Sequence, residues 1–180
     1  RSRYDVTSSP TNPPSGVDAL IAQTSTMLAR YGLSTRDRHR FVLAFAERFA
    51  YIRIQDVWNP WRFLSQMEGA PPVRLGVDGF KHSLLDDANP ARHYAAFVFV
   101  GYWLPGLLAV LMLWAWETAG FVRYAYWSQP DIRSGYVGIF HGRMVRRYGH
   151  TILPSLMARD LPRVTRWDRL SASGAKVIGK

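Results

Sequence analysis

The feature that most constrains the fold of this chain is an uncharged run of twenty-two residues, 95–116, with the sequence AAFVFVGYWLPGLLAVLMLWAW. A helix rises about 1.5 Å per residue, so the run would extend about 33 Å and could cross the roughly 30 Å hydrocarbon core of a bilayer. The run therefore predicts a single transmembrane helix over 95–117. The alternative is a fully buried core helix of a soluble domain, but core helices are usually about half as long.

Both ends of the run carry residue types that are typical of membrane interfaces. Arg92, His93 and Tyr94 lie at one edge, and at the other edge a group of aromatic residues lies within and just beyond the run, with Arg123 after it. These aromatic residues are Trp114, Trp116, Tyr124, Tyr126 and Trp127. Tryptophan and tyrosine favour the level of the head groups, and a long arginine side chain can reach the head groups from within the bilayer edge.

Three residues in or beside the run need separate interpretation. Pro105 removes one backbone hydrogen bond and crowds the preceding turn, so it predicts a kink. Glu117 falls at the predicted helix end, where we expect water or head groups to solvate it; a proton relay is the alternative. His93 is expected to be a plain interfacial residue, and the alternative is a ligand of a haem or a neighbour of a quinone.

The rest of the chain predicts a mainly α-helical protein with extended, loop-rich arms. Apolar residues recur at helical spacing over 17–31 and again from Ser34 or Thr35 to about residue 56, which predicts an antiparallel helical hairpin. Residues 132–148 could form a short amphipathic helix on a surface, although three glycines weaken that prediction. The expected organisation is an extended Pro/Ser-rich arm (1–16), a helical hairpin region (17–68), a loop (69–94), the transmembrane helix (95–117) and a basic C-terminal extension (118–180).

No sequence motif indicates catalysis, a cofactor or a metal site. The chain has no cysteine, and none of its five histidines pairs with another at the spacing of a helical zinc motif. Glycine-rich phosphate-binding loops and the serine nucleophile motif are also absent from the sequence. The sequence therefore predicts that the protein is not an enzyme.

Basic residues form the clearest cluster of functional side chains. The net charge is +10, and residues 123–180 contribute +8 of it. Arg143, Arg146 and Arg147 lie within about one helical turn, and guanidinium groups bind phosphate through paired hydrogen bonds. Beside a membrane helix the nearest phosphates are lipid head groups, so these three residues and Arg123 are the predicted sites for anionic lipid such as cardiolipin. Nucleic acid is the less favoured partner.

A membrane helix, extended arms and a basic extension without catalytic residues are typical of an accessory subunit of a large membrane complex. The sequence thus favours a non-catalytic subunit of an energy-transducing complex that supports its assembly, such as a mitochondrial respiratory complex or ATP synthase. The expected location is the mitochondrial inner membrane, with a bacterial or thylakoid membrane as the alternative. A photosynthetic complex is a less favoured host. The rival hypothesis is a membrane-anchored protein whose basic region holds RNA or a ribosome.

Overall fold

The computed structural model describes residues 14–53, 73–86 and 89–163, and these residues are mainly α-helical, as predicted. The α-helices are α1 (Gly16–Leu28), α2 (Thr35–Ala50), α4 (Pro90–Trp103), α5 (Gly106–Tyr124), α6 (Gln129–Tyr148) and α7 (Leu153–Asp160). Two 3-10 helices, η2 (His82–Leu84) and η3 (His150–Ile152), complete the described elements. Most of the predicted N-terminal arm, part of the hairpin region and loop, and the end of the basic extension lie outside the described residues.

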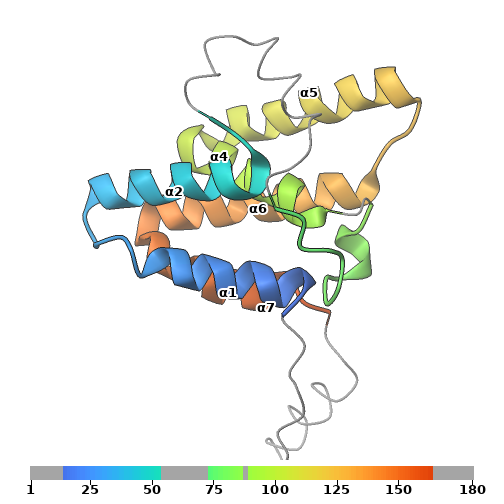
Figure 1. Cartoon of the computed structure of the whole chain (residues 1–180). Helices are drawn as coiled ribbons and strands as arrows, with labels where there is room; N and C mark the ends of the chain where they lie inside the picture. The colour runs from blue at the N-terminus through green and yellow to red at the C-terminus, as the bar shows by residue number, and fades with distance from the viewer. Residues whose placement is uncertain (1–13, 54–72, 87–88, 164–180) are drawn as a thin grey trace, which may run out of the picture.

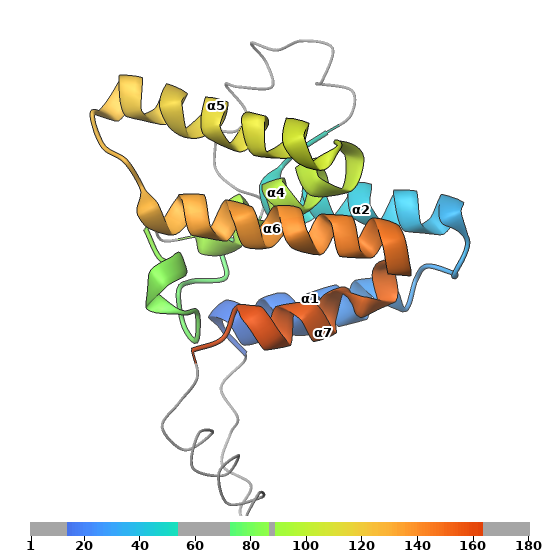
Figure 2. The same cartoon turned by 180° about the vertical axis from the view of Figure 1, so that it is seen from behind.

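The helices lie in three layers, which Figures 1 and 2 show from opposite sides. The middle layer contains α2, α4 and α6. The outer layers are α5 on one side and the pair α1 and α7 on the other, so the two ends of the described chain meet in one layer. The helix predicted over 132–148 is present as α6, but it packs in the middle layer through one buried side and exposes the other.

The aromatic face of α2 forms the centre of the apolar core. Phe41, Phe45 and Phe49 recur every four residues and are fully buried, and consecutive rings of this series lie 5.0–6.0 Å apart. Ser34 caps the helix, since its hydroxyl accepts a hydrogen bond of 3.1 Å from the backbone N–H of Asp37. The predicted apolar stripe of this helix is confirmed, but the helix ends at Ala50, earlier than predicted.

The middle layer depends on close contact between α4 and α6, which run parallel. A Cβ atom on Gly142 would lie 2.2 Å from the carbonyl oxygen of Val98, and one on Gly101 would lie 2.3 Å from the carbonyl oxygen of Ile139. Only glycine permits backbones to approach this closely. The glycines that weaken the helical propensity of α6 are thus the residues that let it pack against α4.

The predicted transmembrane helix is two helices in the structure. The chain leaves α4 at Leu104, whose backbone is extended with ψ 147°, and Pro105 precedes the first residue of α5. Proline has no N–H to continue the helical hydrogen bonds, so the chain turns there and α5 returns along α6 (Figure 1). Among the described residues, no helix combines the length and the apolar character needed to cross a bilayer. The predicted single-pass architecture is therefore wrong, and so is the membrane localisation that was inferred from it.

Candidate metal centre

Three side chains that commonly bind metal ions converge where α4, α5 and α6 meet. They are His93 from α4, Glu117 from α5 and Asp131 from α6, and one ligand atom of each lies within 4.8 Å of the other two. The Nε2 atom of His93 is 3.6 Å from Oε1 of Glu117. The Glu117 side chain is only 7% exposed and that of His93 is 12% exposed. The cluster is therefore largely removed from solvent.

The positions of these residues follow from the packing of the three helices. The α5 helix is buried along one narrow stripe, Ala109, Leu113 and Glu117, so its single acidic residue is turned toward the body of the protein. Gly135 leaves the space for this contact, because a Cβ atom there would lie 2.5 Å from a methyl carbon of Leu113 and 3.3 Å from Nε2 of His93. Asp131 is in the first turn of α6, so its carboxylate is fixed at the start of that helix.

The start of α6 is itself held by a local cap. The hydroxyl oxygen of Ser128 accepts a hydrogen bond of 3.0 Å from the backbone N–H of Asp131. A carboxylate at the start of a helix is favoured by the positive end of the helix dipole. The cap therefore positions Asp131 against α4 and α5.

Burial shifts the pKa values of two of the three side chains, and the shift of His93 favours a metal ion while that of Glu117 opposes one. The pKa of His93 is lowered to about 4, chiefly by burial and also by the charge of Arg92, although a hydrogen bond with the backbone of Asp131 opposes the shift. Burial raises the pKa of Glu117 to about 7, helped by repulsion from Asp131 and Asp86. At neutral pH His93 is therefore a neutral imidazole, which is the form that coordinates metals. Glu117 is partly protonated at this pH, so its carboxyl group releases a proton when an ion binds.

A divalent ion would satisfy the chemistry of this site. The Nε2 atom of His93 is buried and has no hydrogen-bond partner. Imidazole and carboxylate ligands together suit zinc, manganese or ferrous iron. Ligand atoms bound to one such ion at about 2.0–2.2 Å lie roughly 3 Å apart, so small side-chain rotations would close the site.

Sequence analysis assigned none of these three residues to a metal site. His93 was expected at a membrane edge and Glu117 at a solvated helix end, whereas both are largely buried. The three positions are 24 and 14 residues apart, so no short motif connects them. The available signal was Glu117 itself, because it lies four and eight residues after Leu113 and Ala109 and so shares their buried helical face.

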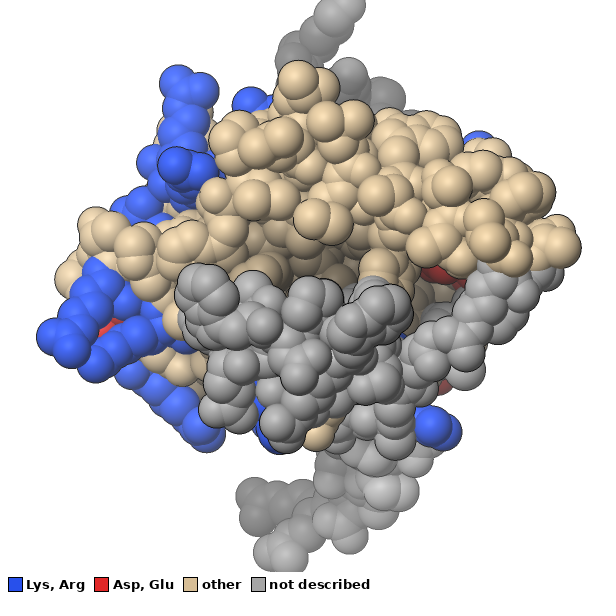
Figure 3. Space-filling model, turned by 90° about the horizontal axis from the view of Figure 1, so that it is seen from above, with Lys and Arg blue, Asp and Glu red and all other residues tan. Residues whose placement is uncertain are grey.

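The structure separates the arginines that were predicted to bind lipid. Arg143, Arg146 and Arg147 are exposed near the C-terminal end of α6, and basic atoms gather at one end of the molecule in Figure 3. Arg123 lies near the C-terminal end of α5, which is at the opposite end of α6 (Figures 1 and 2). The four residues thus do not form one site, and lipid binding stays a prediction.

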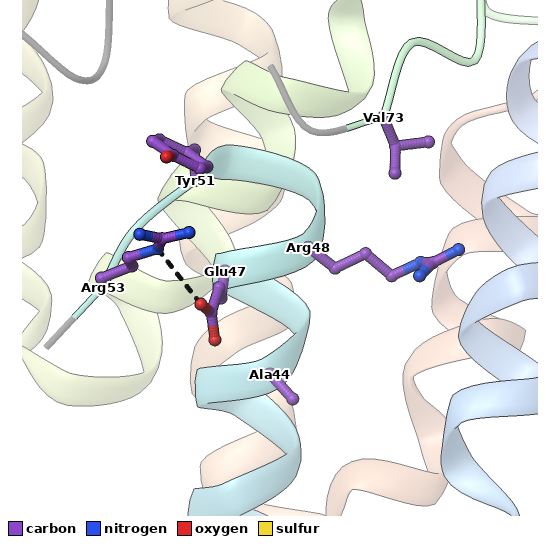
Figure 4. Close-up of a pocket in the computed structure, with 6 residues that line it drawn as sticks. All are labelled: Ala44, Glu47, Arg48, Tyr51, Arg53 and Val73. Carbon is purple, nitrogen blue, oxygen red and sulfur yellow. Dashed lines mark ion pairs between the residues drawn. The ribbon is translucent and has the colours of Figure 1, made fainter. Parts of the chain in front are cut away.

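A hollow of about 340 Å³ at the end of α2 contains basic residues that already have partners (Figure 4). Nε of Arg53 forms an ion pair of 3.2 Å with Glu47, and its guanidinium lies 4.6 Å from the ring centre of Tyr51. Arg48 donates two hydrogen bonds, of 3.1 and 2.7 Å, to the side-chain oxygen of Gln23. These contacts make the hollow a weaker candidate site than the cluster around Glu117.

Comparisons with known proteins give no further guidance to the function. No protein-family model matches the chain, and neither a curated protein nor a solved structure shows significant similarity to it. No relative therefore supports the predicted mitochondrial or respiratory role, and the lack of a membrane-spanning helix in the described residues removes the argument on which that role depended.

Proposed function

We propose that this protein binds one divalent metal ion through His93, Glu117 and Asp131, and that the ion fastens α5 to α4 and α6. The observation that carries the proposal is the convergence of three ligand-type side chains from three helices on one point, where Glu117 is buried and the other two are partly buried. A buried carboxylate is unfavourable unless it is paired or coordinates a metal. Glu117 faces Nε2 of His93 at 3.6 Å, but this contact is long and His93 is uncharged at neutral pH, so an ion would supply a stronger partner.

A fastening role fits the way α5 is packed. The helix contacts the rest of the protein along a narrow stripe, while Leu107 and Leu108 at its start are 73% and 49% exposed. Little apolar area therefore holds α5 in place. An ion that joins the three helices would add the free energy of metal binding to the stability of this layer.

Metal titration of the metal-free protein tests the proposal. We expect one equivalent of Zn²⁺ or Mn²⁺ to bind by calorimetry and to raise Tm, because an ion at one hundred times its Kd adds about 2.7 kcal/mol to the free energy of unfolding. The Glu117→Gln and His93→Gln variants should lose both effects.

The exposed His82 provides the control for adventitious binding to a surface histidine. His82→Gln should bind the ion as the wild type does. Equal binding by the wild type and Glu117→Gln, or no binding by the wild type, would reject the proposed centre. Hydrogen exchange tests whether the ion fastens α5 to α4 and α6. The bound ion should slow the exchange of backbone amides in α5 more than in α1.

Membership of a larger complex and the absence of enzymatic activity stay predictions. The exposed apolar side chains of α5 support the former, since a large apolar patch often marks a surface that another molecule covers. Figure 3 shows this face as a broad area without charged side chains.

A further inference from the structure

A second hollow, of about 380 Å³, lies at the basic end of the molecule, away from the proposed metal centre. It is formed where the start of α2 meets the ends of α4 and α6. Its lining residues are Thr35, Arg38, His39, Tyr102, Trp103 and Arg146. Its volume is within the range of about 300–1,000 Å³ that is typical of sites for small molecules.

Two arginines are held on the wall of this hollow by backbone carbonyl groups. Nη1 of Arg38 donates a hydrogen bond of 2.8 Å to the carbonyl oxygen of Arg146, and Nη1 of Arg146 donates one of 3.5 Å to the carbonyl oxygen of Tyr102. Neither of these bonds neutralises a guanidinium charge. The Nε atom of Arg38 is buried and has no hydrogen-bond partner. The two guanidiniums are thus positioned but retain donors.

The remaining lining residues favour an anionic ligand with an organic part. None of the six lining residues is acidic. Thr35 is the first residue of α2, where the helix dipole is positive, and its hydroxyl can donate a hydrogen bond. The ring of His39 lies 5.0 Å from that of Trp103 and 5.8 Å from that of Tyr102. These rings form an aromatic wall beside the basic groups.

We infer that this hollow binds the phosphate group of a phosphate ester. Arg38 and Arg146 hold the phosphate oxygens, Thr35 donates to one of them, and the aromatic wall contacts the organic part of the ester. Phosphate suits two guanidiniums because it offers several acceptors in the geometry of the guanidinium fork. The ester is either a small soluble molecule or the head group of a lipid. The inference is independent of the proposed metal centre.

The adjacent residues Arg146 and Arg147 provide a matched test. Both are exposed arginines of α6, but only Arg146 lines the hollow, while the guanidinium of Arg147 lies 5.2 Å from the ring centre of Tyr148. Removing either one changes the net charge equally. Binding of inorganic phosphate and glycerol phosphate is measured by calorimetry on the full chain.

We expect Arg146→Ala to raise Kd roughly tenfold or more, because the variant loses hydrogen bonds between two oppositely charged groups. Arg147→Ala should change Kd less than about twofold, since a distant exposed charge is screened by salt. Thr35→Val should also weaken binding, and it leaves the charge unchanged. Equal losses in Arg146→Ala and Arg147→Ala would overturn the inference, because they would indicate a diffuse effect of net charge. No binding of any phosphate probe would also overturn it.

Vesicles distinguish the two sources of the phosphate ester. One set contains phosphatidylcholine alone and the other adds phosphatidic acid, whose phosphate is a monoester. Sedimentation with the second set that is lost in Arg146→Ala and kept in Arg147→Ala would identify the lipid head group as the ligand. Binding of glycerol phosphate with the same variant pattern, without sedimentation, would identify a soluble ester. Circular dichroism of each variant checks that the fold is retained.

Discussion

At the scale of single residues, His141 is a fully buried group with two side-chain hydrogen-bond partners. Its Nε2 atom lies 2.9 Å from a carboxylate oxygen of Asp160, and its Nδ1 atom lies 2.7 Å from the hydroxyl oxygen of Tyr94. Asp160 is ionised at neutral pH, so Nε2 carries the proton and Nδ1 accepts from the tyrosine. Tyr94 and His141 are both fully buried, so this network joins α4, α6 and α7 rather than facing a substrate.

The pKa of Asp160 predicts how the network responds to acid. Hydrogen bonds from Arg159 first, and from His141, lower this pKa to about 2. The carboxylate of Asp160 therefore binds a proton less readily in the folded state than in the unfolded state. The ionised Asp160 carboxylate stabilises the folded state above its ordinary pKa of about 3.8, and this stabilisation is lost as the pH falls toward 2.

Urea unfolding between pH 2 and 6 measures this effect. As the pH falls, the free energy of unfolding of the wild type should decrease by about 1 kcal/mol more than that of Asp160→Asn, since solvent screens the exposed Arg159. Asparagine cannot be protonated in this range but can still accept a hydrogen bond from His141. Parallel pH profiles for the two proteins would show that Asp160 is not stabilised in its ionised form.

At the scale of elements, α5 is an apolar helix that buries only part of its surface. Leu113 is fully buried, whereas Leu108, from the same apolar run, is 49% exposed. A helix that is apolar on all sides is usually buried in a large core or in a membrane. The exposed side of α5 is therefore the surface of the described structure that is best suited to be covered by another molecule.

The packing of α5 can be tested by truncating one leucine on each side. Leu113→Ala should lower the free energy of unfolding by about 2–5 kcal/mol, because it leaves a cavity among α4, α5 and α6. Leu108→Ala should change it by roughly 0.5 kcal/mol or less, as is usual for exposed positions. Denaturant unfolding of both variants gives the comparison. A similar large loss in both would mean that Leu108 is buried in solution.

At the scale of the whole molecule, the glycine contacts between α4 and α6 build the middle layer, against which the two outer layers pack. Gly142 lies against the backbone of both Val98 and Tyr102, with no space for a side chain. Two parallel helices at this distance place His93 beside Asp131 and leave room for α5 across them. The proposed metal centre thus depends on backbone approach as well as on its ligands.

Alanine substitution at two helical glycines tests this dependence. Gly142→Ala should destabilise the protein by about 1–3 kcal/mol or more, since the helices must move apart to admit the methyl group. Gly120→Ala should be neutral or stabilise by up to about 1 kcal/mol, because Gly120 has no atom within 4 Å of an added Cβ and alanine favours helix. Thermal unfolding measures both. Equal Tm values for wild type and Gly142→Ala would show that α4 and α6 are less close than described.

The sequence by itself determined the mainly helical class and much of the local structure. The four-residue spacing of Phe41, Phe45 and Phe49 predicted the buried face of α2, and Ser34 marked its start. These features depend on neighbours within one or two turns, so a local pattern is sufficient to predict them. The same local reasoning also identified Pro105 as a break, although it predicted a kink within one helix.

Only the tertiary structure decided how the apolar run is used and which polar residues meet. A long apolar sequence has the same local signal whether it crosses a bilayer or folds back against its own chain. The turn at Leu104 and Pro105 and the contact of α4 with α6 select the second outcome here. His93, Glu117 and Asp131 come together for the same reason: they lie far apart along the chain, and their distances depend on how three helices pack.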